Sequence, residues 1–500
     1  MAARDYRRAA EVGLLGCAGL CFVVLTWYHW PHICDDAFIG FRYAENVVAG
    51  AGPVWNRGEA VEGYSSPLWL GLLVVGRALG AALPAWAGAW GVGCALVCLL
   101  LVHRLALALS ESRLTAAAAG AAGALLYPLY YWAPAGLETT MFAALVTAAA
   151  WSLVARSAWA WAPVAALLGV ARPEGPLLVL ALLGLARLAH GRAALRPGQL
   201  LVGLGPAAAG LAFRRWYFGE WLPNTYFAKA TGELLARLTT GTIYASLGLA
   251  ALVATVAAVW VGGLATRKHL AGIAFAGVVL AVVMGAGGDW MWHARLLLPV
   301  LPACLAFTSA GVAATPAGRR FVVALGCVLA WSGFLPRPGL LVDAFTGGRL
   351  PAVAFQEGTL VSANLAAAHF IAEHYPAEAL LAVNHAGALP YALPNPVIDM
   401  AGLCDRHIAR EVAGGLHQKF DPAYVLARKP RLVVLNSRVR PGTAGTWYHP
   451  GYWAGETALV AQPEFAARYR ALPSFWAWRW QGTGGGGYVL LYERISDGPI

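Results

Sequence analysis

Long apolar runs alternate with short polar segments over the first two thirds of the chain. The first run follows Arg4, Arg7 and Arg8 and ends near Trp30, and its length of about 20 residues suits a membrane helix. Ten further runs of this type cover approximately residues 84–104, 113–133, 137–156, 157–171, 175–190, 198–216, 241–263, 268–286, 294–314 and 319–336. We therefore expect about 11 transmembrane helices within a helical membrane module over residues 1–336.

Basic residues recur at every second junction between these runs. The basic junctions contain His103, Arg104 and Arg113; Arg156; Arg187, Arg192 and Arg196; Arg267 and Lys268; and Arg319 and Arg320. Cytoplasmic loops are enriched in Lys and Arg, so the N-terminus and these junctions are predicted to be cytoplasmic. The other junctions, beginning with a first outer loop over 31–83, are then predicted to face the outside.

One apolar stretch, residues 66–82, does not fit this alternation. If it crossed the membrane, the preceding loop and the basic junction at Arg104 would lie on the same side. Arg77 near its middle also argues against a full span. We interpret this stretch as an interfacial or re-entrant helix beside the outer leaflet.

The composition changes after about residue 337. Short β-type runs at 380–383, 432–435 and 488–491 stand in a mixture of polar and apolar residues. This pattern predicts a soluble, extracytoplasmic α/β domain over 337–500. The expected fold class is an α-helical polytopic membrane protein with this domain at its C-terminal end.

Composition supports the membrane assignment and limits the functions to consider. The chain of 500 residues is 59% hydrophobic and 12% charged, which excludes an ordinary cytosolic enzyme and a disulfide-stapled secreted module. The net charge of +11 is attributed to the basic junctions, so no nucleic-acid partner is expected. Cys34 and Cys404 lie outside the apolar runs on the predicted outer side, where a disulfide between them is one alternative.

The polar groups of the outer loops are the first candidates for function, because an unpaired carboxylate near a membrane is costly to keep. These loops contain Asp35, Asp36, Glu45, Glu59, Glu62, Glu138, Arg172, Glu174, Lys229, Asp289, His293 and Arg295. A proton- or ion-coupled transporter would place its ionisable groups near the membrane midplane instead. We therefore expect a site on the outer face.

Several segments of this face resemble a known family. They are DDAFIGFRYAEN at 35–46, VWNRG at 54–58, VEGYSSPLW at 61–69, GLETT at 136–140, RPEG at 172–175, PNTYFAK at 223–229, GGDW at 287–290 with the following residues to 299, and VIDMAGLCD at 397–405. Together they resemble the C-type (GT-C) glycosyltransferases, which take a sugar from a polyprenyl-phosphate carrier. The similarity is greatest to bacterial arabinofuranosyltransferase-like members, and more distant to protein O-mannosyltransferases and lipid A aminoarabinose transferases.

The resemblance implies an enzyme of the bacterial plasma membrane. Its partners would be a polyprenyl-phosphate-linked sugar, a pentose or a hexose, and a hydroxyl acceptor on a cell-envelope glycan, lipid or protein, with membrane lipids around it. Transfer on the outer face would invert the anomeric centre. The alternative is a transporter or flippase of lipid-linked sugars, which would need the same headgroup site without a catalytic base.

Glycosyl transfer needs a base for the acceptor hydroxyl, and the resemblance places it in the first outer loop. Asp35 matches the leading acid of the family's pair and is the expected general base, with Asp36 as the second candidate. Both could instead cap the helix that begins near residue 37. Glu138 is the third catalytic candidate, through acceptor positioning or a metal, with capping of the run at 137–156 as its alternative.

The remaining candidates would bind substrate. Arg172, Lys229, His293 and Arg295 are the outer cations that could hold a phosphate, and Arg295 and Lys229 are preferred. Lipid headgroups are the alternative ligands of these cations. Asp289 could reach the sugar or pair with Arg295, and Glu174 could neutralise Arg172. The cofactor stays open: Asp35, Glu138 and Asp289 offer oxygen ligands that suit Mg²⁺ or Mn²⁺.

The outer loops are also rich in aromatic residues, which have two interpretations. They could form an aromatic belt at the membrane interface or stack on sugar rings. The residues concerned are Trp55, Tyr64, Trp69, Trp216, Tyr217, Trp221, Tyr226, Trp290 and Trp292.

Overall fold

The structure is a computed structural model that describes most of the chain. The described residues are 2–30, 33–155, 157–229, 233–289, 291, 293–336, 343–344, 352–414, 418–438, 453–479 and 486–495. Arg156, Trp290 and Trp292, together with the predicted domain boundary near residue 337, lie outside them.

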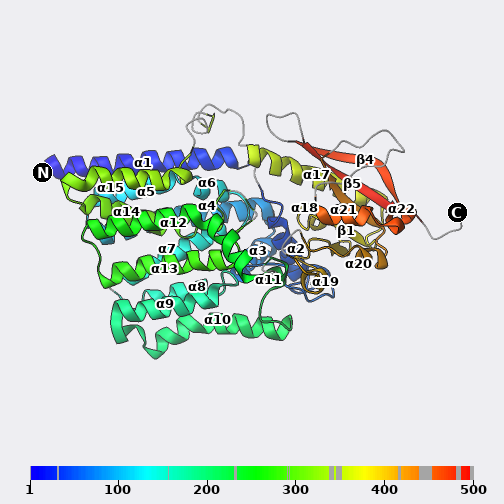
Figure 1. Ribbon diagram of the computed structural model, residues 1–500, viewed down its shortest axis with the longest axis horizontal. Helices are drawn as coiled ribbons and strands as arrows, with labels where there is room; N and C mark the ends of the chain where they lie inside the picture. Colours follow the sequence, from blue (N-terminus) through cyan, green and yellow to red (C-terminus); the bar gives the residue numbers. More distant parts are fainter. Residues whose placement is uncertain are drawn as a thin grey trace.

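The predicted membrane module is a bundle of helices that run side by side (Figure 1). Its members are α1 (Ala2–His29), α4 (Leu83–Ser110), α5 (Arg113–Ala124), α6 (Tyr127–Trp132), α7 (Thr139–Val154), α8 (Trp161–Leu168), α9 (Gly175–His190), α10 (Pro197–Tyr217), α12 (Leu234–Val261), α13 (Arg267–Gly285), α14 (Leu301–Ala314) and α15 (Ala317–Trp331). Within the described residues, six segments are long and apolar enough to cross a membrane: Arg8–His29, Leu83–Ser110, Gly175–Ala194, Leu234–Val261, Arg267–Gly285 and Ala317–Phe334. The protein is thus a polytopic helical membrane protein, and the total of about 11 spans stays a prediction.

Some predicted spans are shorter or interrupted in the structure. The run at 113–133 is divided into α5 and α6, and Pro128 stands at the start of α6, where its missing N–H is tolerated. The run at 294–314 is helical only from Leu301, after a turn-rich segment, and Pro302 again stands at the start of the helix. Hydropathy predicts the extent of an apolar run, whereas the position of proline limits where a helix within that run can begin.

Close approach of helix backbones holds parts of the bundle together. Gly311 of α14 lies so near Ala258 of α12 that a Cβ atom at Gly311 would overlap the backbone of Ala258. Small residues have this role in membranes, where packing rather than water exclusion drives helix association. Thr140 of α7 also donates a 2.8 Å hydrogen bond to the carbonyl of Gly91 in α4.

Two helices of the first outer loop lie at the end of the bundle that faces the C-terminal domain (Figure 1). They are α2 (Ala37–Val48) and α3 (Pro67–Ala78). The 12 residues of α3 extend only about 18 Å, too little for a hydrocarbon core of roughly 30 Å. Arg77 of α3 pairs with Glu45 of α2 at 2.6 Å, so the charge inside this apolar helix has a partner.

The C-terminal domain contains a five-stranded mixed sheet. Its strands are β1 (Leu381–Val383), β2 (Val397–Asp399), β3 (Leu432–Ser437), β4 (Tyr469–Arg479) and β5 (Gly486–Arg494), in the order β2-β1-β3-β5-β4. The three strands β2, β1 and β3 are parallel, while β5 is antiparallel to β3 and β4. The predicted β-type runs correspond to β1, β3 and β5. The described helices of this domain are α17 (Ala352–His374), α18 (Ala388–Tyr391), α19 (Arg406–Glu411), α20 (Pro422–Ala427), α21 (Ala454–Val460) and α22 (Pro463–Arg468).

The first outer loop and the C-terminal domain are joined through Arg42 of α2. This buried guanidinium donates hydrogen bonds to the carbonyl of Trp55 in its own loop at 2.8 Å, and to the carbonyls of Pro390, Leu393 and Asn395 in the domain. Asn56 adds a reciprocal pair with Val397, since it accepts from the N–H at 3.1 Å and donates to the carbonyl at 2.8 Å. The first outer loop is therefore part of the interface with the C-terminal domain.

Cys34 and Cys404 do not form the disulfide considered from the sequence. The N–H of Cys34 donates to Ala135, before α7, while that of Cys404 donates to Asp399 at the end of β2. The contacts through Arg42 and Asn56 join the same two regions without a covalent link.

Candidate active site

A cavity lies where the bundle meets the first outer loop and the C-terminal domain. Its volume is about 90 Å³. Every one of the five predicted outer loops contributes to its wall, and the domain contributes Leu403. The polar and aromatic lining residues are Asp36, Tyr64, Ser65, Ser66, Trp69, Glu138, Arg172, Thr225, Lys229 and Arg295.

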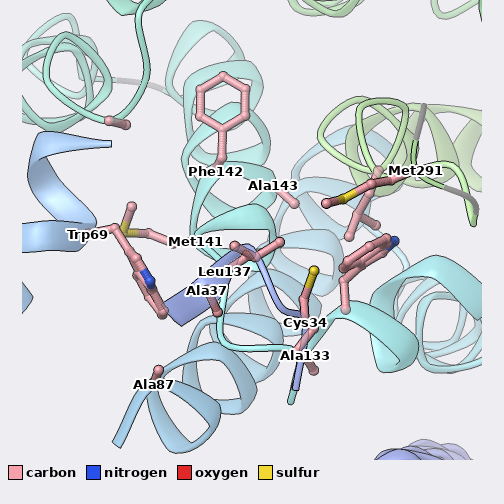
Figure 2. Packing of buried hydrophobic residues seen from close by; sticks show 14 of the residues in the cluster. Cys34, Ala37, Trp69, Ala87, Ala133, Leu137, Met141, Phe142, Ala143 and Met291 are labelled. Carbon is pink, nitrogen blue, oxygen red and sulfur yellow. The ribbon is translucent and has the colours of Figure 1, made fainter. Parts of the chain in front are cut away.

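The wall of the cavity continues into packed side chains. Leu137 lines the cavity and belongs to the same buried cluster as Ala37, Trp69 and Met141 (Figure 2). The indole N–H of Trp69 donates to the carbonyl of Gly136 at 3.1 Å, and Ser66 caps α3 by accepting from the N–H of Trp69. The first and second outer loops are thereby held against each other.

Asp36 is the carboxylate of the first outer loop that lines the cavity. It stands at the N-cap position of α2, yet its side chain makes no capping hydrogen bond. Within the described part of the chain its carboxylate has no ion pair or hydrogen bond. The capping alternative therefore does not account for this side chain, which is available to a ligand in the cavity.

Asp35, the expected general base, does not line the cavity. Its carboxylate is directed into the C-terminal domain, where it accepts a 3.0 Å hydrogen bond from the N–H of Ala388 and a 3.5 Å bond from Asn364. Nδ1 of His385 lies 3.9 Å from Oδ2 of Asp35. Burial raises the pKa of Asp35, and His385 opposes this shift. The geometry assigns Asp35 to the domain interface and leaves Asp36 as the acid in the cavity.

Arg172 and Glu138 both line the cavity and form a largely buried ion pair. Arg172 contacts Glu138 at 2.6 Å and Glu174 at 2.8 Å. Burial alone would lower the pKa of Arg172, but the charges of Glu174 and Glu138 outweigh this effect and raise it. Glu138 stands at the N-cap of α7 without a capping bond, so its partner is the guanidinium and not the helix. Glu174 does not line the cavity and acts through Arg172.

Arg295 reaches the cavity from the fifth outer loop and is held by Asp289. The two side chains form a bidentate pair, with contacts of 2.6 and 3.1 Å. Asp289 follows Gly287 and Gly288, whose positive φ angles of 89° and 81° glycine adopts without strain. Asp289 itself is not among the lining residues, so it orients Arg295 and does not face a ligand.

Lys229, at the end of α11 (Asn224–Lys229), differs from the two arginines. Its ammonium forms no hydrogen bond or ion pair with any residue the structure describes. Burial lowers the pKa of Lys229, while the negative charge of Asp36 acts in the opposite direction. An anion in the cavity would supply the missing partner.

Comparisons with known proteins place this geometry in a fold family. The structure resembles that of ArnT from Cupriavidus metallidurans in the apo state, with a TM-score of 0.56 and 14% identity over 98% of both chains. The same protein bound to undecaprenyl phosphate gives a TM-score of 0.51 and 15% identity, over 98% of this chain and 100% of that one. The apo oligosaccharyltransferase of Archaeoglobus fulgidus gives a TM-score of 0.51 and 13% identity, over 86% of this chain and 70% of that one. The chain has the GT-C fold.

Sequence comparisons support the relationship of this GT-C chain to glycosyltransferases. It is 32% identical over 254 residues to the terminal β-(1→2)-arabinofuranosyltransferase of Mycobacterium tuberculosis. This match covers 45% of the chain and 39% of that relative, so the chain spans well under half of its length. Residues 353–492, within the C-terminal domain, match a family model described as a domain of unknown function.

His293 is the predicted cation that this GT-C structure places elsewhere. One ring nitrogen lies 2.5 Å from the hydroxyl of Tyr127, and the ring packs at 4.3 Å from that of Tyr131, behind the cavity wall. Its φ angle of 65° is left-handed, and its carbonyl accepts from the indole of Trp132. His293 therefore shapes the turn that leads to Arg295.

The carboxylates considered as metal ligands are not gathered into one donor set. Glu138 is paired with Arg172 and Asp289 with Arg295, while Asp35 is directed into the C-terminal domain. Among the residues that the structure describes, no group of three His, Cys, Asp or Glu could hold a metal ion. The Mg²⁺ or Mn²⁺ site considered from the sequence stays a prediction.

Sequence reasoning missed several residues of the cavity. Ser65, Ser66 and Thr225 supply hydroxyl groups, and Leu403 reaches the cavity from the domain. The signal was present, because these positions fall inside the segments at 61–69, 223–229 and 397–405 that resemble the family. Tyr64 and Trp69, among the aromatic residues with two interpretations, line the cavity, which suits contact with a ligand.

Proposed function

We propose that this protein is a membrane glycosyltransferase. It would transfer a pentose or hexose from a polyprenyl-phosphate donor to a hydroxyl of a cell-envelope glycan, lipid or protein. The observation that carries the proposal is one cavity lined by a carboxylate, Asp36, and an ammonium, Lys229, neither of which has a partner among the described residues. A base and an anion-binding cation are the two groups that this transfer needs.

Asp36 is the general base of this mechanism. Its carboxylate accepts the proton of the acceptor hydroxyl while that oxygen attacks the anomeric carbon of the sugar. The hydroxyl groups of Ser65 and Thr225 and the ring of Trp69 line the same cavity and suit recognition of a sugar. A single displacement of this kind inverts the anomeric configuration.

The cations stabilise the leaving group. As the bond from the anomeric carbon to the phosphate oxygen breaks, negative charge grows on the released polyprenyl phosphate. Lys229, Arg172 and Arg295 line one cavity and place positive charge there before the reaction begins. Arg172 and Arg295 are held by Glu138, Glu174 and Asp289, which favours a fixed geometry and reduces reorganisation during transfer.

The positive-inside pattern favours a cavity open to the outer face of the plasma membrane. All five loops that line the cavity lie at the junctions predicted to face the outside. The ArnT structure described as bound to undecaprenyl phosphate supports a lipid phosphate as the carrier. The donor sugar, the acceptor and the linkage are left to the experiment.

The deciding experiment uses the full-length protein in lipid nanodiscs with a panel of labelled polyprenyl-phosphate sugars. Sugar release or transfer is followed for the wild type, Asp36→Asn and the matched control Asp35→Asn. We expect turnover with particular donors, loss of turnover in Asp36→Asn with donor binding retained, and substantial activity in Asp35→Asn.

Three results would each contradict a part of the proposal. Equal turnover in Asp36→Asn and the wild type would remove the assigned base. Absence of turnover with every donor, together with equal scrambling of lipid-linked sugar by all three proteins, would favour the flippase instead. A product that keeps the donor's anomeric configuration would exclude the single displacement.

A further inference from the structure

A second cavity lies near the opposite end of the bundle, between α1, α4 and α5, and has no part in the proposed transfer. Its volume is about 410 Å³. Helix α5 packs against both α1 and α4, and the three helices leave a groove between them. Its apolar walls include Leu15 and Gly19 of α1, Leu96 and Leu100 of α4, and Gly120 of α5.

The groove has an apolar length and one polar end. Leucine, alanine and glycine side chains line most of it, whereas Glu11, His103, Arg104 and Arg113 gather where α4 ends and α5 begins. From Glu11 to Gly19 it follows α1 for about 12 Å, and from Leu96 to Leu107 it follows α4 for about 16 Å. Roughly 15 Å is the depth of one leaflet of a bilayer.

Several polar side chains at the polar end of the groove lack hydrogen-bond or ion-pair partners among the described residues. Arg104 is exposed and makes no hydrogen bond or ion pair with the residues described. Among the described side chains, Arg113 pairs only with Glu11, at 3.9 Å, and 68% of its side chain is exposed. Nδ1 of His103 is buried without a hydrogen-bond partner in the described structure. Two guanidinium groups against one carboxylate leave a net positive charge at the end of an apolar groove.

The structure assigns this groove to an anionic glycerophospholipid. One acyl chain would lie between α1 and α4, and the phosphate would contact Arg104 and Arg113, with His103 within the same polar end. The length of the groove matches an acyl chain confined to one leaflet, and its charge favours an anionic over a zwitterionic headgroup. The basic junction at Arg104 and Arg113 places the site in the cytoplasmic leaflet.

Gly19 offers a direct test because it leaves room in the groove. A Cβ atom at Gly19 would meet nothing within 4 Å, so Gly19→Leu fills the groove without a clash at its attachment point. Gly16→Leu is the matched control, since Gly16 also has nothing within 4 Å but does not line the groove. Leucine favours a helix more than glycine, so both variants are expected to fold.

The experiment measures phospholipid retained on the full-length protein by native mass spectrometry, in equimolar phosphatidylglycerol and phosphatidylcholine. We expect the wild type and Gly16→Leu to retain phosphatidylglycerol with a preference of about tenfold, as two arginines near a phosphate would supply. Gly19→Leu should lose the bound lipid, and Arg104→Gln with Arg113→Gln should lose the preference. Arg319→Gln, at another predicted cytoplasmic junction, should keep it.

Three outcomes would overturn the assignment. The first is an equal preference in the wild type and the double arginine variant, and the second is equal retention by Gly19→Leu and Gly16→Leu. The third is displacement of phosphatidylglycerol by an equimolar polyprenyl phosphate, which would make the occupant a carrier lipid. None of these measurements depends on sugar transfer, so the test stands apart from the proposed activity.

Discussion

Asp35 and Asp36 are consecutive residues whose carboxylates face different parts of the protein. Asp36 lines the cavity, while Asp35 accepts a hydrogen bond from Ala388 of the C-terminal domain. The turn before α2 separates the two side chains, so that Asp35 contacts the C-terminal domain while Asp36 has no polar partner among the described residues. Under the proposed function, Asp36 acts on the acceptor hydroxyl, while Asp35 contacts the C-terminal domain.

This division predicts unequal effects of the same substitution. Asp36→Asn should lower the transfer rate by about 10²–10⁴-fold, the usual contribution of a positioned general base. Asp35→Asn keeps an oxygen that can accept from Ala388, so its rate should fall by less than about tenfold. Initial rates at saturating donor test this prediction. Equal losses in the two variants would contradict it.

Lys229 should control donor affinity with a characteristic pH dependence. Lys229→Gln should raise the donor Kd by at least about tenfold, because a buried phosphate contact is lost. Burial lowers the pKa of Lys229, so its positive charge is lost at a lower pH than that of an exposed lysine. Donor binding should weaken as pH rises through that lowered pKa, and titration calorimetry can follow it.

The control for this prediction is Lys268, at a predicted cytoplasmic junction, whose ammonium donates to the carbonyl of Ala155. Lys268→Gln should leave both the donor Kd and its pH dependence unchanged. The prediction fails if the two lysine variants bind the donor equally well.

Arg42 should hold the C-terminal domain against the first outer loop. Arg42→Met would remove the donor to the buried carbonyl groups of Leu393 and Asn395, whereas the carbonyl of Trp55 keeps the amide of Asn46. At about 1–3 kcal/mol for each of these two unsatisfied groups, we expect a loss of at least about 2 kcal/mol. Thermal unfolding and limited proteolysis of the domain measure this loss. Arg57→Met, at an exposed position of the same loop, should change stability little.

Asp399 should make stability fall as pH rises. This buried carboxyl accepts from the N–H groups of Ala401 and Cys404, which oppose the shift, yet burial raises its pKa to about 7. The pKa of this carboxyl is about 4 in the unfolded chain and about 7 in the folded protein. Between these two pH values the native state binds the proton more tightly than the unfolded state does. Stability should therefore decrease across this interval by a few kcal/mol at most and level off above it.

Melting temperatures from pH 4 to 8 test the role of Asp399. Asp399→Asn should remove this part of the decrease, whatever its effect on stability at a single pH. Asp421 has a lowered pKa, to which its hydrogen bond with His407 contributes, so its contribution to stability is lost only below about pH 4, and Asp421→Asn should leave the slope between pH 4 and 8 unchanged. A pH profile for Asp399→Asn that parallels the wild type would contradict the prediction.

The sequence predicted which polar residues line the cavity, because each belongs to an outer loop. The outer loops follow from the lengths of the apolar runs and from the positions of the basic junctions. Asp36, Glu138, Arg172, Lys229 and Arg295 come from five loops and line one cavity. The β-type runs at 380–383, 432–435 and 488–491 also became strands. Helix limits were harder to predict, since proline and local turns move them within an apolar run.

By itself, the sequence determined the membrane character of the bundle and the set of loops that carry polar chemistry, because both follow from how residues partition between water and lipid. Only the tertiary structure decided which of two adjacent acids enters the cavity, that His293 lies behind the wall, and that Glu138 and Asp289 are paired with arginines. Glu138 and Asp289 pair with arginines 34 and 6 residues away, whereas the partners of Asp35 and His293, Ala388 and Tyr127, lie more than a hundred residues away along the chain. Local patterns carry no information about such partners.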